Sequence, residues 1–166
     1  MKTLLTILFL LLALLSNKNE IFTEDVLVKD INGKEVNLKD FETTKDTVMV
    51  FLWAKWCGAC KMRLDYYKAN KRYRNYQILA IAVTQGDSID KEKEIINKHQ
   101  WPFQIYFDNN QNIAKFFIKK GYFKQPKEQK DFGFYGFPQT FMFVKNIFLC
   151  KSCDKYANPY SQKKVK

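Results

Sequence analysis

The chain has 166 residues, 16% of them aromatic, so one domain with a substantial core fits this length and burial does not limit folding. Its net charge of +11 comes from scattered lysines and arginines without a recognition motif, which argues against a nucleic-acid partner. We expect a soluble, lysine-rich surface, and the charge leaves open an attraction to acidic partners or anionic lipid.

The N-terminus has the pattern of a targeting segment. Lys2 precedes an apolar run from Leu4 to Leu15, which suits the hydrophobic region of a signal peptide and is short for a transmembrane helix. We expect residues 1–16 to be a signal peptide or an N-terminal membrane anchor, and residues 17–25 to be a polar linker. In either case the folded part would lie outside the cytosol, in the periplasm or secreted.

A hairpin and a central strand follow the linker. Residues 26–37 predict a β-hairpin that turns at Asn32-Gly33, a strong short turn signal. The apolar run of residues 47–52 is rich in β-branched and aromatic residues, which predicts a buried strand. Residues 61–68 then place apolar groups at helical spacing without a helix breaker.

Two cysteines lie where this strand gives way to the helix. Cys57 falls at or just before the helix N-terminus, where unpaired N–H groups and the helix dipole favour a thiolate and lower its pKa. Cys60 lies one turn further, close enough to attack a mixed disulfide. We therefore predict that Cys57 is a nucleophile, aided by the positive charges of Lys55 and Lys61, and that the more buried Cys60 resolves the mixed disulfide.

Strands and helices alternate along the rest of the chain, which is the order of an α/β sheet. Residues 77–83 predict a strand, and residues 89–98 a helix capped by residues 86–88. A strand over 103–107 and a helix over 112–119 follow.

A last hairpin is expected over residues 140–150, turning at Lys145-Asn146. If that turn has two residues, Val144 faces Ile147 and Phe141 faces Cys150.

These motifs together resemble the thioredoxin superfamily, and more closely the envelope thiol–disulfide oxidoreductases of the TlpA, ResA and DsbE type. Residues 53–60 resemble the active-site motif of that family, residues 30–41 its N-terminal hairpin, and residues 136–141 its cis-proline loop. The resemblance implies an α/β thioredoxin-like fold, a mixed β-sheet flanked by helices with an N-terminal β-hairpin extension. We expect this domain over residues 26–153, followed by a basic tail over 154–166.

The resemblance also implies a function. Cys57 and Cys60 would be catalytic, and Trp56, Phe137 and a cis Pro138 would contact an extended substrate segment lying across the disulfide. The substrates would be disulfides of envelope or secreted proteins, and an envelope or membrane reductant would restore the cysteines. The resemblance implies no cofactor and no metal in the site, and we expect a monomer.

Two positions depart from the family, and the end of the chain, residues 150–166, makes a poor final helix. Phe51 stands where thioredoxin has a buried Asp, and Gln85 stands where ResA-like proteins have a Glu, with Asp87 close by. The identity of the carboxylate that handles protons therefore stays open.

His99, the only histidine, is expected to contact the helix dipole rather than to take part in catalysis.

Residues 119–135 form a long basic loop ahead of the proline. Long ordered loops in compact domains are often functional, so we predict that this one borders the active site and binds a partner. A tolerated surface insertion is the alternative.

Cys150 and Cys153 form a second CxxC near the end of the chain. Continuing the hairpin would bring Cys153 level with Pro138, so the pair is either a second redox pair or a structural disulfide. A metal-binding protein that holds zinc or copper with both CxxC pairs is the alternative function. A catalytically silent module is disfavoured by the intact CxxC, and a peroxidase by the lack of a Thr-x-x-Cys motif.

Overall fold

A computed structural model describes residues 21–84, 89–124 and 136–151 of the chain. The targeting segment, Gln85, Asp87, the cap expected over 86–88, most of the long loop, Cys153 and the basic tail lie outside the described residues. In the part of the chain that is described, no helix has both the length and the apolar character needed to cross a membrane.

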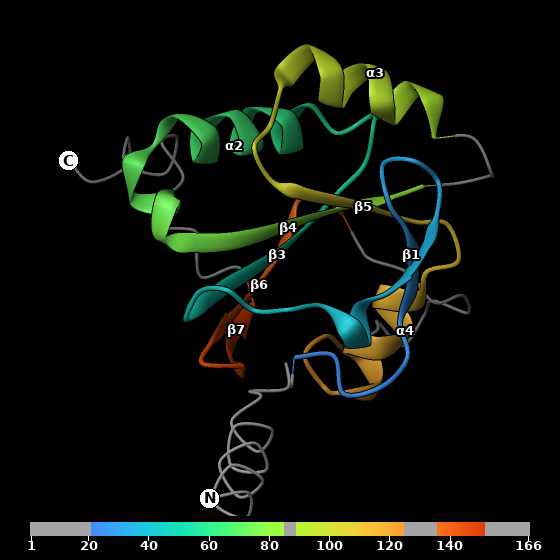
Figure 1. Ribbon diagram of the computed structural model, residues 1–166, viewed down its shortest axis with the longest axis vertical. Helices are drawn as coiled ribbons and strands as arrows, with labels where there is room; N and C mark the ends of the chain where they lie inside the picture. Colours follow the sequence, from blue (N-terminus) through green and yellow to red (C-terminus); the bar gives the residue numbers. More distant parts are fainter. Residues whose placement is uncertain (1–20, 85–88, 125–135, 152–166) are drawn as a thin grey trace, which may run out of the picture.

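The described residues build a seven-stranded mixed sheet with the order β2-β1-β5-β4-β3-β6-β7 (Figure 1). The strands are β1 (Leu27–Lys29), β2 (Glu35–Asn37), β3 (Thr47–Trp53), β4 (Tyr76–Val83), β5 (Gln104–Asp108), β6 (Gln139–Val144) and β7 (Ile147–Lys151). β3 runs parallel to β4 and β4 to β5, whereas the other neighbours pair antiparallel. The α/β fold predicted from the sequence is confirmed.

Helices cover both faces of this sheet. They are α2 (Gly58–Ala69), α3 (Asp90–His99) and α4 (Asn112–Lys119), with short 3-10 turns η1 (Leu38–Asp40) and η2 (Lys71–Asn75). α2 and α3 lie together on one face, and α4 lies on the other (Figure 1). The residue ahead of α3 is Ile89, and it makes no side-chain capping bond.

The central strands are apolar on both sides because each side faces a helix layer. In β3, Val48, Val50 and Leu52 belong to the core on the α4 face. The alternate residues Met49, Phe51 and Trp53 belong to the core on the α2 face. Side chains of a strand alternate between faces, so one apolar run serves both cores.

The N-terminal hairpin forms, but its connection is longer than a two-residue turn. Asp30 N–H donates to the Lys34 carbonyl at 2.8 Å, so residues 31–33 make the loop. The Asp30 carboxylate also accepts the N–H groups of Asn32 and Lys34 at 2.9 Å each. Gly33 has φ +83°, which a glycine adopts without steric cost. The Asp30 side chain thus supplies hydrogen-bond acceptors for the backbone N–H groups of this three-residue loop.

The C-terminal hairpin turns at Lys145-Asn146, as predicted, with positive φ at both residues. Val144 faces Ile147, but a β-bulge follows, and Met142 rather than Phe141 faces Cys150. The predicted pairing of Phe141 with Cys150 is therefore wrong by one residue, because β7 carries one extra residue at the bulge. A one-residue slip moves a side chain to the other face of a sheet. Cys150 accordingly packs with the core on the α2 face.

Candidate redox site

The first active-site element is the connection from β3 to α2. A tight turn closes it, in which Cys57 N–H donates to the Ala54 carbonyl at 2.9 Å. Lys55 and Trp56 are the two corner residues of this turn. Cys57 is the N-cap of α2, with extended backbone at φ −83° and ψ 96°. The strand and the helix therefore fix Cys57 at the helix N-terminus, as the sequence predicted.

Cys57 and Cys60 form a disulfide with their Cα atoms 5.3 Å apart. The Cys60 N–H donates to Cys57 Sγ at 3.1 Å, so the sulfur occupies the place of a capping oxygen. After reduction, this N–H and the helix dipole would stabilise a thiolate on Cys57. Cys60 is fully buried and Cys57 is 5% exposed, whereas Gly58 and Ala59 between them are exposed. Another molecule that carries a disulfide would approach the two sulfurs past these two small residues.

Two of the residues predicted to bind substrate, Trp56 and Phe137, pack together next to the core that contains the disulfide. The peptide bond between Phe137 and Pro138 is cis, as the sequence predicted. The Phe137 ring meets Trp56 edge-to-face at 5.5 Å and packs against the core that contains both cysteines. Trp56 is 69% exposed, whereas Trp53 is fully buried against Trp101. Trp56 and Phe137 thus offer an aromatic surface, and Trp53 has a packing role.

The charges near Cys57 differ from the sequence-based expectation. Lys55 Nζ lies 3.5 Å from Oε1 of Glu92, a carboxylate that is 1% exposed. Lys61 Nζ donates to the Lys55 carbonyl at 3.2 Å. The positive charge expected from Lys55 is therefore paired with a buried negative charge from α3. Glu92 was missed by the sequence analysis, although it shares one helical face with the apolar Ile89 and Ile96.

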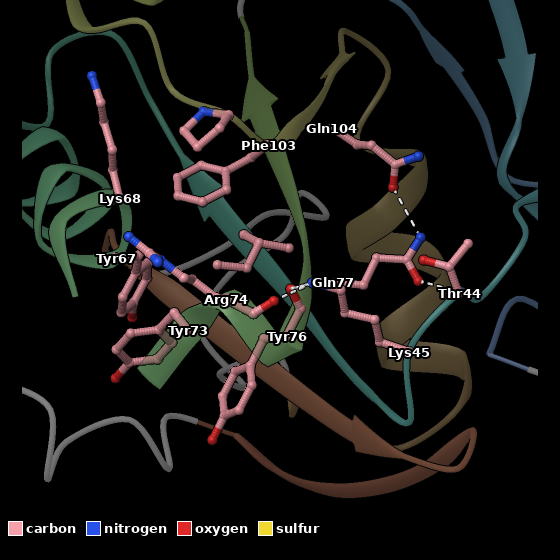
Figure 2. Close-up of a pocket in the computed structure, with 12 residues that line it drawn as sticks. Thr44, Lys45, Tyr67, Lys68, Tyr73, Arg74, Tyr76, Gln77, Phe103 and Gln104 are labelled. Atoms are coloured by element: carbon pink, nitrogen blue, oxygen red, sulfur yellow. Dashed lines mark hydrogen bonds between the residues drawn. The ribbon is translucent and has the colours of Figure 1, made fainter. Parts of the chain in front are cut away.

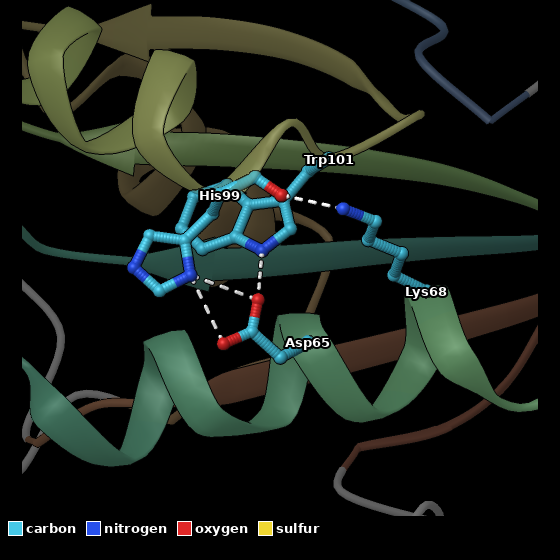
Figure 3. Close-up of polar contacts among 4 residues, drawn as sticks. All are labelled: Asp65, Lys68, His99 and Trp101. Carbon is cyan, nitrogen blue, oxygen red and sulfur yellow. Dashed lines mark hydrogen bonds and ion pairs between the residues drawn. The ribbon is translucent and has the colours of Figure 1, made fainter.

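A second polar cluster ties α2 to the end of α3 (Figure 3). Asp65 accepts a hydrogen bond from Trp101 Nε1 at 2.8 Å, and His99 Nδ1 lies 2.9 Å from the same carboxylate oxygen. The His99 ring stacks on Trp101, and Lys68 Nζ donates to the His99 carbonyl at 2.7 Å. His99 thus makes a specific contact across two helices, more than the dipole contact that was expected, and lies away from the disulfide.

The hollow shown in Figure 2 lies at the opposite end of the sheet from Cys57. It has a volume of about 340 Å³ and is lined by Thr44, Lys45, Tyr67, Lys68, Tyr73, Arg74, Tyr76, Gln77, Ile78, Pro102, Phe103 and Gln104. Gln77 donates to Gln104 and to the Glu42 carbonyl, and Lys45 Nζ donates to the Arg74 carbonyl. These polar groups are used by the fold, so the hollow does not compete with the disulfide as the reactive site.

The second CxxC is described only in part. Cys150 is engaged in a disulfide and is partly buried against the α2-face core. Its role, as a redox or a structural residue, stays a prediction together with that of Cys153. Among the described residues, no three cysteine, histidine, aspartate or glutamate side chains are grouped as metal ligands.

Comparison with known proteins places the chain in a family. A model of the AhpC/TSA family matches residues 22–148. No curated protein matches the sequence.

Solved structures match the fold at low identity. A thioredoxin-like protein from Porphyromonas gingivalis has a TM-score of 0.58 at 15% identity, covering 84% of each chain. The thioredoxin domain of a thiol-disulfide oxidoreductase from Bacteroides vulgatus has a TM-score of 0.55 at 14% identity, covering 84% of this chain and 92% of that one. A protein described as a putative DsbE thiol:disulfide interchange protein from Chlorobium tepidum has a TM-score of 0.53 at 20% identity, covering 84% of this chain and 89% of that one. The thioredoxin-like fold is confirmed, and the Cys57–Cys60 disulfide within it fits a CxxC motif.

Proposed function

Because the chain belongs to the AhpC/TSA family and has a thioredoxin-like fold, we propose that it exchanges disulfides of other proteins through Cys57 and Cys60. One observation carries the proposal: Cys57 caps α2 and its sulfur accepts the Cys60 N–H at 3.1 Å. This placement favours the thiolate, and the thiolate is the species that attacks a disulfide.

The reducing reaction proceeds in two exchanges. The Cys57 thiolate attacks a substrate disulfide and forms a mixed disulfide, while the displaced substrate sulfur leaves as a thiolate and takes up a proton. Cys60 then loses its proton and attacks Cys57 Sγ, which releases the second substrate sulfur and forms the Cys57–Cys60 bond. Two electrons pass from the protein to the substrate, and the same steps in reverse would oxidise a dithiol.

The substrate segment would lie over the exposed Gly58 and Ala59, against Trp56 and Phe137. Trp56 supports this assignment because a large aromatic ring that is 69% exposed beside a reactive bond is available for contact. Pro138, next to Phe137, would border the same segment.

We also propose that the protein works outside the cytosol, on envelope or secreted proteins. The apolar run of residues 4–15 would direct its export or anchor it, and a periplasmic or membrane reductant would renew the dithiol. Structural disulfides are substrates that such compartments supply.

Trapping tests the proposal. The Cys60→Ser variant should accumulate disulfide-linked complexes through Cys57, because the resolving sulfur is gone, and Cys57→Ser should form none. Insulin reduction by dithiothreitol should fall to the uncatalysed rate in both variants. Catalysis that persists in Cys57→Ser would contradict the assignment.

The metal-binding alternative and the disfavoured peroxidase function each have their own readout. Zinc or copper that copurifies under reducing conditions and is lost in Cys57→Ser would support the metal-binding alternative. Consumption of hydrogen peroxide without a protein disulfide would support a peroxidase.

A further inference from the structure

Glu92 is a buried carboxylate that the exchange reactions of Cys57 and Cys60 do not use. Its side chain is 1% exposed, and within the described part of the chain neither carboxylate oxygen has a hydrogen-bond partner. A buried charge without hydrogen bonds is costly unless a counter-charge compensates it. Here the compensation comes from Lys55, whose Nζ lies 3.5 Å from Oε1.

The position of Glu92 on α3 places it on the helical face that packs against the core of the candidate redox site. Ile89 and Ile96 lie three residues before and four residues after it, so the three side chains share one helical face. Both isoleucines pack in the core cluster that includes Cys57 and Cys60. Its partner Lys55 is a corner residue of the turn that Cys57 closes by donating to the Ala54 carbonyl.

We propose that the Lys55–Glu92 ion pair tunes the Cys57–Cys60 couple toward the reducing side by cancelling the ammonium charge of Lys55, which stands two residues before Cys57. An uncompensated cation near a thiol favours its thiolate. A more stable thiolate stabilises the reduced protein and makes its disulfide a stronger oxidant. Glu92 is thus a positioning residue that acts through Lys55. This inference rests on the proposed function of the CxxC.

The other charged groups near the pair do not replace this compensation. Lys61 Nζ, from α2, donates to the Lys55 carbonyl at 3.2 Å. Asp65 of α2 and His99 of α3 pair with each other, and His99 lies about 10 Å along the helix axis from Glu92. The remaining charged residues of α3 lie on its outer side or are only partly covered; they are Asp90, Lys91, Lys93, Glu94 and Lys98.

Glu92→Gln is the direct test, because the amide keeps the shape of the side chain and removes its charge. We expect the pKa of Cys57, measured by thiolate absorbance in the reduced protein, to fall by about half a unit to one unit. The equilibrium with glutathione should shift toward the reduced protein by about threefold to tenfold.

Two variants separate this effect from a general loss of negative charge. Glu94→Gln removes an exposed carboxylate from the same helix and should leave the pKa and the glutathione equilibrium of Cys57 close to wild type. The double variant Glu92→Gln/Lys55→Met removes both charges and should return both quantities to wild-type values. A full shift that persists in the double variant would overturn the inference, as would an equal shift in Glu94→Gln.

Glu92→Met keeps the test decisive if Glu92→Gln does not fold, because an apolar side chain of similar length needs no hydrogen bonds in this buried place. It removes the same charge, so the pKa of Cys57 should fall as in Glu92→Gln, and an unchanged pKa overturns the inference. The failure of the proposed function looks different. In that case wild-type Cys57 would ionise like a free thiol and catalyse no exchange, whichever residue stands at position 92.

Discussion

The two faces of the sheet share the same strands but differ in what they bury. On the α4 face the core is aromatic and aliphatic, and the Phe117 ring centroid lies 4.2 Å from that of Phe141 and 6.4 Å from that of Phe143 in tilted contacts. On the α2 face the core contains Cys57 and Cys60, and two buried polar groups on this side, Glu92 and Trp53 Nε1, lack hydrogen-bond partners within the described residues. Such exceptions to the packing rules concentrate where a protein does its chemistry.

The contrast is sharpest between the two buried carboxylates. Asp108 is fully buried, and its two oxygens accept the N–H groups of Asn112 and Ile113 at 2.9 and 3.0 Å at the start of α4. Its hydrogen bonds serve the fold. Glu92 receives no such donors and faces Lys55 instead. One carboxylate therefore stabilises a helix, and the other is available to influence a reactive sulfur.

Truncation on the α4 face should have the largest effect on stability. Phe117→Ala removes a fully buried ring and should cost about 3–5 kcal/mol in the free energy of unfolding. Urea denaturation measures this loss. Insulin reduction per folded molecule should stay at the wild-type level, and a fall in that rate would show that the two faces are not separate in function.

Loss of the polar cluster that joins α2 to the end of α3 should have a smaller effect on stability. Asp65→Ala removes the acceptor of Trp101 Nε1 and the partner of His99, and should cost about 1–2 kcal/mol because the carboxylate is half exposed. Lys68→Met, which loses a surface bond to the His99 carbonyl, is the control and should stay within about 0.5 kcal/mol of wild type. Equal losses in both variants would mean that the carboxylate has no special role.

A change at an exposed residue next to the N-terminus of α2 should affect substrate binding without affecting stability. Trp56→Ala should change the unfolding free energy by less than about 0.5 kcal/mol, since the ring is 69% exposed. We expect the KM for a protein disulfide to rise about threefold to tenfold and the reaction with a small disulfide to stay near wild type. A KM that does not change would remove Trp56 from the substrate site.

The smallest expected effect is a pH dependence on the α4 side. Burial raises the pKa of Asp108 above its ordinary value of 3.8, against hydrogen bonds that lower it. The native state therefore keeps this proton at a pH where the unfolded chain has lost it, so this group makes stability fall as pH rises above about 4. Asp108→Asn abolishes that term.

Urea denaturation at several pH values from 4 to 7 tests the direction of this pH dependence. The unfolding free energy of Asp108→Asn, relative to that of wild type, should increase as the pH rises. A difference that moves the other way would mean that Asp108 ionises more easily in the folded protein.

The sequence predicted the features of the fold that depend on residues close together in the chain. The strands, the three α-helices, the turn at Lys145-Asn146 and the N-cap position of Cys57 follow from apolar periodicity and turn residues, and the structure agrees. The bulge in β7 was missed because residues 148–150 carry no glycine or other bulge signal. The resulting change of face for Cys150 could not be foreseen.

Contacts between distant residues were also missed. Asp65 meets Trp101 across 36 positions in the sequence, and neither residue is unusual in its own helix or loop. Glu92 stands in a run of charged residues, Asp90-Lys91-Glu92-Lys93-Glu94, that is typical of a solvated helix. Only packing of α3 on the sheet shows which of these charges is buried.

The ionisation of Cys57 tests the account most directly. The fully reduced wild-type protein would be treated with iodoacetamide across a range of pH, and the labelled cysteine identified by mass spectrometry. We predict that Cys57 reacts first, with a midpoint well below the value of about 8.5 for a free thiol, while Cys60 stays protected. A midpoint for Cys57 at or above the free-thiol value would contradict a thiolate stabilised by the N-terminus of α2.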